Sequence, residues 1–221
     1  MNAGALLHLL QFASPALPNG GYSYSQGLET AIDGGTVTDA ASARDWIAGC
    51  LLGVIATWDA PLLWRLLKAV DAGDDAEVAL WSERFIASRD SPEFRAETIQ
   101  MGYSLTRLVA ELGLADVSKL GAEVSRPTAF ACAVSALGIP HREALLAMLF
   151  SWAENQVLVC VKSVPLGQMA GQRLLLSLAP DLEEAAQRAC TLTDGEMPNW
   201  APGYSMLSMR HEVQHGRLYR S

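Results

Sequence analysis

The residues best placed to do chemistry lie near the end of the sequence, in the segment His211-Glu212-Val213-Gln214-His215. This segment satisfies the H-E-x-x-H pattern of zinc metalloproteases. In that pattern two histidines one helical turn apart bind Zn²⁺, and the glutamate polarises the water bound to the metal. The segment therefore raises the hypothesis of a zinc-dependent peptidase that uses His211, Glu212 and His215.

The residues that follow His215 argue against a zinc site. Such a site needs a third protein ligand, which in the familiar arrangements lies downstream of the second histidine. Only residues 216–221 follow, and they contain no Asp, Glu or His. Gly216 would end the helix, and Arg217 and Arg220 would repel a dication. We therefore predict no metal ligands here, expect a polar helical tail whose imidazoles face solvent or a partner, and keep the peptidase as the alternative.

Other catalytic patterns are missing. The glycine-rich stretch PNGGYSYSQG lacks the G-K-[ST] of a phosphate-binding loop and does not follow a strand. No Ser-His-Asp or Cys-His arrangement can be selected from the spacing of the four histidines. The four cysteines form no C-x-x-C pair and are expected to be buried thiols in a reducing compartment; they are Cys50, Cys132, Cys160 and Cys190. These patterns favour a binding or scaffold role over catalysis.

Composition excludes two classes of partner. The formal net charge is −8, and the 16 basic residues form no cluster, so nucleic acid is not an expected ligand. The most apolar stretch, residues 47–70, is interrupted by Asp59, Pro61 and two basic residues, and its uncharged part is shorter than the roughly 20 residues needed to cross a bilayer. The N-terminal apolar stretch has no preceding Lys or Arg and contains polar residues, so we interpret it as a retained amphipathic helix and not as a signal peptide or membrane anchor.

The elements that must position these residues are helices. Apolar residues recur at helical spacing nearly everywhere, and alternating β-strand patterns are nearly absent. We predict an all-α fold: one domain, residues 1–221, forming a bundle of about eight to ten helices. Expected helix starts include Thr38 as a cap, Pro61, Ser91-Pro92, Arg126-Pro127 and Pro140. Residues 193–205 are expected to form the one long loop before the terminal segment.

Three blocks of the sequence resemble the UreF family of urease accessory proteins. They are LLQFASPALPNGGYSYSQGLE near the N-terminus, VKSVPLGQMAGQRLL, and SMRHEVQHGRLYRS. The family ending reads S-M-R-H-E-x-Q-x-x-R-L-F-R-S and does not require a histidine at the position of His215. The resemblance therefore implies that the H-E-x-x-H pattern is a coincidence.

The resemblance also implies a function. UreF proteins are all-α, cytoplasmic and homodimeric, and are not enzymes. They join UreD (called UreH in some species) and the nickel-carrying GTPase UreG in a complex that activates the urease apoprotein. A UreF-like chain is expected to couple or gate GTP hydrolysis to nickel delivery and to bind no cofactor itself, since nickel and GTP are handled by the complex.

The family blocks assign candidate site residues. Those expected on the GTPase side are Tyr22, Ser25, Glu29, Lys162 and Gln168, with the loop residues presenting Ser23, Ser25 and Glu29 outward. The loops themselves are attributed to Pro15, Pro18, Gly20, Gly21, Gly27, Pro165 and Gly167. Two structural alternatives stay open: the first block can simply cap and pack helices, and Lys162 can simply neutralise a helix C-terminus.

Residues 205–221 are expected to form the tail that binds UreD/UreH. The candidate contacts are Arg210, His211, Glu212, Arg217, Leu218, Tyr219 and Arg220. Arginine and tyrosine are residue types that anchor protein interfaces, and a solvated tail gains order by docking. For Arg217 we favour a simple salt bridge over an arginine finger.

Overall fold

Five helices begin at a side chain that caps them in the computed structural model, which describes all 221 residues. Ser91 Oγ accepts a hydrogen bond from the backbone N–H of Phe94, and Pro92 occupies the first turn of α6 (Pro92–Glu111). Ser125 caps α7 (Arg126–Ala136) in the same way, through the N–H of Thr128. The starts predicted at Ser91 and Arg126 are therefore confirmed.

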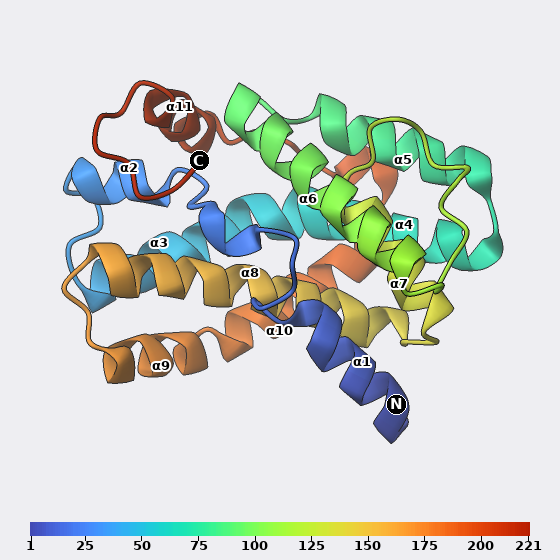
Figure 1. Ribbon diagram of the computed structural model, residues 1–221. Helices are drawn as coiled ribbons and strands as arrows, with labels where there is room; N and C mark the ends of the chain where they lie inside the picture. Colours follow the sequence, from blue (N-terminus) through green and yellow to red (C-terminus); the bar gives the residue numbers. More distant parts are fainter.

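The chain contains helices and no β-strands (Figure 1). In order, the elements are α1 (Ala3–Ala13), η1 (Gly21–Ser23), α2 (Leu28–Asp33), α3 (Ala40–Cys50), η2 (Leu51–Asp59), α4 (Ala60–Ala72), α5 (Asp75–Ala87), α6, α7, α8 (His141–Ser163), α9 (Gln168–Ser177), α10 (Ala179–Thr191), η3 (Asp194–Glu196) and α11 (Pro202–His211). Because α3, η2 and α4 form one continuous helix, the bundle has ten α-helical rods. The all-α prediction is confirmed.

The helix from Ala40 to Ala72 differs from the prediction at both positions where a helix start was expected, Thr38 and Pro61. Its cap is Asp39, whose side chain accepts from the N–H of Ser42, and not Thr38. Pro61 does not start a separate helix. The segment before it, η2, is π-helical, and a π-helix is a wider turn that redistributes the backbone hydrogen bonds. Since proline lacks an N–H, we attribute the unbroken passage into α4 to this wider turn.

The loops also differ from the prediction in two places. The non-helical segment 112–125 between α6 and α7 is a second long loop, in addition to the region between α10 and α11. The terminal helix α11 begins at Pro202, inside the stretch expected to be a loop. Turn residues therefore predicted where the helices are interrupted, but not how long the connecting loops are.

A single cluster of 50 buried apolar residues runs from Ala5 in α1 to Tyr219 near the end of the sequence. The continuous helix 40–72 and α8 lie inside the bundle, with α9 and α10 on one side and α5, α6 and α7 on the other (Figure 1). These two helices are long and apolar enough to cross a membrane, but much of each is buried within the bundle. Core helices of soluble proteins have the same length and composition, so these features do not indicate a membrane span.

Gly102 sets the spacing between α6 and the start of α7. A Cβ atom at this position would lie 1.9 Å from the carbonyl oxygen of Val124, so only glycine allows this approach. The contact fixes the loop end at Val124 and Ser125, and thereby the position of Arg126 at the first turn of α7.

Candidate functional site

The first and third sequence blocks are joined by backbone hydrogen bonds. The carbonyl oxygen of Ser221 accepts from the N–H groups of Ser25 (2.6 Å) and Gln26 (3.0 Å) and from the hydroxyl of Ser25. The N–H of Arg220 donates to the carbonyl of Ser23 at 2.8 Å. The C-terminal segment thus crosses back over α2, as Figure 1 shows, and is part of the folded core.

A buried ion cluster fastens α11 to α2 and α6. His211 has no exposed surface; its Nε2 lies 2.9 Å from Glu29 Oε2 and its Nδ1 lies 2.9 Å from Glu93 Oε2. Glu29 also accepts from the backbone N–H groups of Leu218 (2.7 Å) and Tyr219 (3.1 Å). Arg217 pairs with Glu93 at 2.8 Å, which confirms the salt bridge favoured for this arginine. Every carboxylate of this cluster therefore has charged or N–H partners.

Two expectations about these residues are wrong. Ser25 and Glu29 are buried and do not point outward; they hold the C-terminal segment in place. His211 is likewise enclosed and does not face solvent, whereas His215 is exposed as expected. Both errors come from partners more than 100 residues away in sequence, which no local pattern reveals.

The same geometry disfavours the zinc peptidase. Helix α11 ends at His211, so His215 does not lie one helical turn further along the same helix. Both nitrogens of His211 already face carboxylates on opposite sides of the ring. No group of three His, Cys, Asp or Glu side chains is placed to hold a metal ion.

The outer surface of this region combines apolar and basic side chains, and we call it the tail surface. Its apolar members are exposed and come from α11 and the residues after it: Met206, Met209, Val213 and Leu218. Its basic members, Arg210, Arg217 and Arg220, are exposed beside them, as is Glu212. Residues 205–221 contain three arginines and one glutamate, so this surface is locally basic on a chain whose net charge is −8.

The loop under the tail surface has an unusual backbone. Gln26 has φ of +56°, a left-handed conformation uncommon for residues other than glycine, and Gly27 follows with φ of +79°. A Cβ on Gly27 would lie 3.3 Å from Leu207 Cβ, so glycine also permits the close approach of α11. Of the other loop residues, Gly20 is left-handed, and Pro15, Pro18, Pro165 and Gly167 are exposed, whereas Gly21 is half-buried against Met101.

The second sequence block approaches the C-terminal segment at Lys162. Lys162, in the last turn of α8, places its Nζ 5.9 Å from the centre of the Tyr219 ring. Burial, together with the negative charge of Glu29, raises the pKa of Tyr219 to about 12. Gln168 begins α9 and is exposed, as is Tyr22 in the first block.

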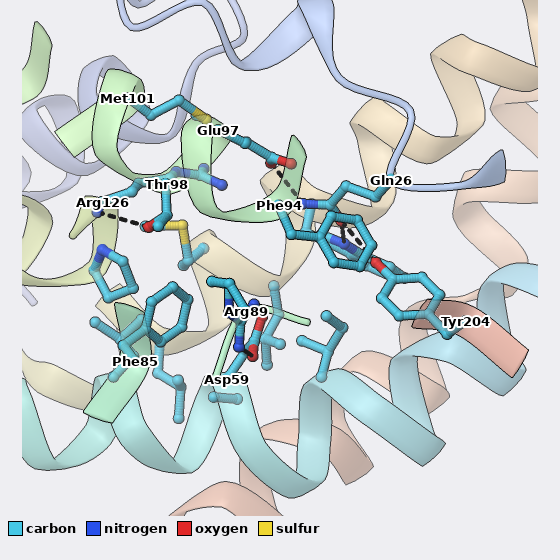
Figure 2. A pocket seen from close by; sticks show the side chains of 18 residues that line it. Gln26, Asp59, Phe85, Arg89, Phe94, Glu97, Thr98, Met101, Arg126 and Tyr204 are labelled. Atoms are coloured by element: carbon cyan, nitrogen blue, oxygen red, sulfur yellow. Dashed lines mark hydrogen bonds and ion pairs between the residues drawn. The ribbon is translucent and has the colours of Figure 1, made fainter. Parts of the chain in front are cut away.

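A cavity of about 80 Å³ lies beside this region and was not predicted (Figure 2). Gln26 reaches into it from the strained loop: its Nε2 donates to Glu97 at 2.6 Å, and its Oε1 accepts from Trp152 Nε1 at 2.7 Å and from Tyr204 at 3.2 Å. Glu97 is one helical turn after Glu93 on α6. The cavity and the buried ion cluster are therefore neighbours on the same helix.

Besides Tyr204, four ionisable side chains line this mostly apolar cavity: Asp59, Arg89, Glu97 and Arg126. Arg89 forms a two-pronged ion pair with Asp59, at 2.7 and 3.2 Å. Burial raises the pKa of Glu97 to about 7, partly offset by the hydrogen bond from Gln26 and the charge of Arg126. Burial lowers the pKa of Arg126. The four residues are scattered along the sequence, and no spacing pattern could have linked them.

The four cysteines are all free thiols, as predicted, and three are buried. Burial raises the pKa of Cys50 and Cys160 to about 12 and that of Cys132 to about 11. Cys190 is only half-buried, and its pKa is also raised by desolvation. None of the four is an activated thiolate.

Comparison with known proteins finds relatives whose names agree with one another. The UreF family profile matches residues 37–179. The chain is 62% identical, over the full length of both chains, to the urease accessory protein UreF of Janthinobacterium sp. strain Marseille. It is 59% identical to the protein of the same name from Nitrosospira multiformis, with 98% of each chain covered. It is also 45% identical to the bifunctional urease accessory protein UreEF of Bordetella bronchiseptica, in which the match covers all of this chain and 53% of that protein.

Proposed function

The chain belongs to the UreF family of urease accessory proteins, and we propose that it acts as a non-catalytic adaptor that bridges UreD/UreH and the GTPase UreG during nickel insertion into the urease apoprotein. In this role it couples or gates GTP hydrolysis to nickel delivery. Nickel is cargo of the assembled complex, and GTP is bound by UreG.

The observation that carries this proposal is the convergence of the family blocks on one surface. The buried ion cluster, with Glu29, His211 and Glu93, holds the C-terminal segment in a fixed shape. A fixed segment presents Arg210, Leu218 and the α11 side chains without the entropic cost of ordering a free tail. The tail surface is therefore a preorganised docking face, and its arginines fit a partner whose facing surface is acidic.

The UreD/UreH contact falls on the outward-facing members of the tail, namely Arg210, Glu212, Arg217, Leu218 and Arg220. The buried members, His211 and Tyr219, support that surface from below. On the GTPase side, Tyr22, Lys162 and Gln168 are available for contact, and Ser25 and Glu29 act through the shape of the C-terminal segment.

Two further features of the family role follow. The bifunctional UreEF protein joins a UreF-like sequence to a second accessory function within one chain, so the two functions are expected to operate close together in space. The protein is expected to be cytoplasmic and homodimeric; the exposed leucines Leu6, Leu7 and Leu10 of α1 offer an apolar face for self-association.

The central experiment mixes the protein with its cognate UreD/UreH and measures the mass of the complex by size-exclusion chromatography with light scattering. Leu218→Asp places a charge on a side chain that is 71% exposed, so it should abolish the complex and leave the fold intact. Leu176→Asp on α9 is the matched control, because Leu176 is 77% exposed and lies away from the tail surface. Equal complex formation by both variants would refute the tail surface as the docking face.

A second measurement separates the two partners. Lys162→Ala combined with Gln168→Ala should leave the UreD/UreH complex intact but weaken recruitment of UreG and change its rate of GTP hydrolysis. An unchanged GTPase rate and unchanged recruitment would remove these residues from the GTPase side.

A further inference from the structure

Two arginines line the cavity, and Arg126 is the one whose guanidinium forms no hydrogen bond or ion pair; Glu97 attracts it only from beyond ion-pair distance. Only its backbone N–H is bonded, to Thr98 Oγ1 at 3.2 Å, and this is the dashed line that joins the two residues in Figure 2. Its Nε is shielded from solvent and has no hydrogen-bond partner, and no carboxylate oxygen lies within ion-pair distance of the side chain. Arg89, by contrast, forms an ion pair with Asp59 through both terminal nitrogens of its guanidinium.

A half-buried guanidinium with no hydrogen-bonded anion, as at Arg126, is costly. Burying a charge without a partner costs several kcal/mol or more, so such groups are normally paired or bind a ligand. Arg126 also lies at the first turn of α7, where the helix dipole adds positive potential. The local field therefore favours an anion.

The space in front of Arg126 consists of two adjoining cavities. The larger, of about 80 Å³, and the smaller, of about 30 Å³, share five lining residues: Gln26, Glu97, Met101, Arg126 and Trp152. The smaller one also touches Asn19, Gly21 and Tyr22, and Tyr22 is exposed, so it leads toward the loop surface. A single water needs only about 10–15 Å³ on this measure, so the larger cavity has room for a small organic molecule.

The walls define the chemistry of that molecule. Most of the lining of the larger cavity is apolar and includes Leu63, Phe85, Leu145, Met148 and Leu149. A guanidinium forms two parallel hydrogen bonds with a planar carboxylate. We propose that Arg126 anchors a binding site for a small aliphatic monocarboxylate, whose charged end meets the guanidinium and whose short alkyl chain enters the apolar cavity.

The neighbouring charges predict how binding depends on pH. Besides Arg126, the ionisable groups that line the cavity are Asp59 of η2, Arg89 after α5, Glu97 of α6 and Tyr204 of α11. Asp59 and Arg89 neutralise each other, so Glu97 is the group that competes with an incoming anion. Because the pKa of Glu97 is about 7, the anion should bind when Glu97 is protonated and weaken as Glu97 ionises.

The test measures the thermal stability of the isolated full chain with increasing sodium acetate, propionate or butyrate at constant ionic strength, with sodium chloride as the reference salt. A ligand that binds the native state raises Tm in a saturable, concentration-dependent manner. We expect saturable stabilisation by the carboxylates and none by chloride. Binding at about pH 8 should be about tenfold weaker than at about pH 6, since one competing proton is involved.

Three variants make the test specific. Arg126→Gln should abolish the carboxylate effect, whereas Arg95→Gln, which removes an exposed arginine of α6 paired with Glu123, should retain it. Glu97→Gln keeps Arg126, so it should bind carboxylate with little dependence on pH, and this result does not require the Arg126 variant to fold. The proposal is overturned if chloride stabilises equally, if Arg126→Gln still responds, or if Glu97→Gln shows no carboxylate binding. No urease partner takes part, so the outcome is independent of the adaptor role.

Discussion

Two clusters of ionisable residues lie one helical turn apart on α6 and are built in opposite ways. The first, around Glu93, places His211 between two carboxylates and adds Arg217 and two backbone N–H groups. The second, around Glu97, gives that carboxylate only neutral donors within hydrogen-bond distance and leaves Arg126 without a partner. The two are linked by Ser221, whose carbonyl is held by the first block and whose hydroxyl lies 3.4 Å from Glu97.

The difference separates groups that complete the fold from groups left available for binding. A fully satisfied buried network specifies one arrangement of the chain, whereas an unsatisfied one costs stability and persists only with a compensating role. The Glu93 cluster therefore has a structural role, which is to hold the C-terminal segment in place. We interpret the Glu97 cluster as a binding site for a ligand that comes from outside the chain.

The largest effect should come from breaking the satisfied cluster. His211→Ala removes the imidazole between Glu29 and Glu93 and leaves two buried carboxylates facing each other, so it should lower the free energy of unfolding by about 3–5 kcal/mol. For a chain of this size the loss corresponds to a fall in Tm of roughly 10 °C, measurable by circular dichroism.

His215→Ala is the matched control, because it removes the second histidine of the same motif from an exposed position. Its effect on the free energy of unfolding should stay within about 0.5 kcal/mol. Comparable losses from the two histidine variants would mean that the cluster around His211 does not hold the C-terminal segment.

The next effect has the opposite sign and belongs to the unsatisfied cluster. Below the usual glutamate pKa of 4.5, Glu97 is protonated in both folded and unfolded chains and contributes nothing. Between 4.5 and about 7 the folded chain keeps a proton that the unfolded chain releases, so stability falls as the pH rises. Above about 7 the full cost, about 3 kcal/mol, is present.

Glu97→Gln should therefore stabilise the protein above pH 7 and leave it unchanged at low pH. Urea unfolding of the variant and the parent across this pH range measures the difference directly. A difference that does not grow with pH would show that Glu97 is not the group that destabilises this cluster.

The smallest effect is expected at the rim of the satisfied cluster. The side chain of Arg217 is 39% exposed, so its pair with Glu93 is screened by solvent. Arg217→Ala should cost about 1 kcal/mol or less, and the cost should shrink as salt is added. A salt-independent loss as large as that of His211→Ala would place Arg217 inside the network and not at its rim.

Local sequence signals predicted that helices form more reliably than they predicted whether consecutive helices are continuous. The Ser91-Pro92-Glu93 start and the all-α character follow from capping and helical spacing, which depend on neighbouring residues. The unbroken helix through Pro61 does not, because a π-helical turn and packing on both sides compensate for the missing N–H.

The candidate site shows the same limit more strongly. The three family blocks located the residues that meet at the tail surface, but not which of them are buried: Glu29 and His211 lie 182 residues apart and find each other only in the folded chain. The sequence identified Arg126 only as part of a helix start. An arginine at a Ser-x-Pro helix start is ordinary, and Arg126 is unusual only because no carboxylate lies within ion-pair distance of its guanidinium.

The state of the four cysteines makes the protein accessible to site-specific labelling. Native thiols with raised pKa values, three of them buried, react slowly with maleimides, which attack the thiolate. A cysteine introduced at exposed Leu176, the control position away from the tail surface, would then be the most reactive thiol on the molecule. A fluorophore placed there would report partner arrival by energy transfer, without first removing any native cysteine and without disturbing the proposed docking residues.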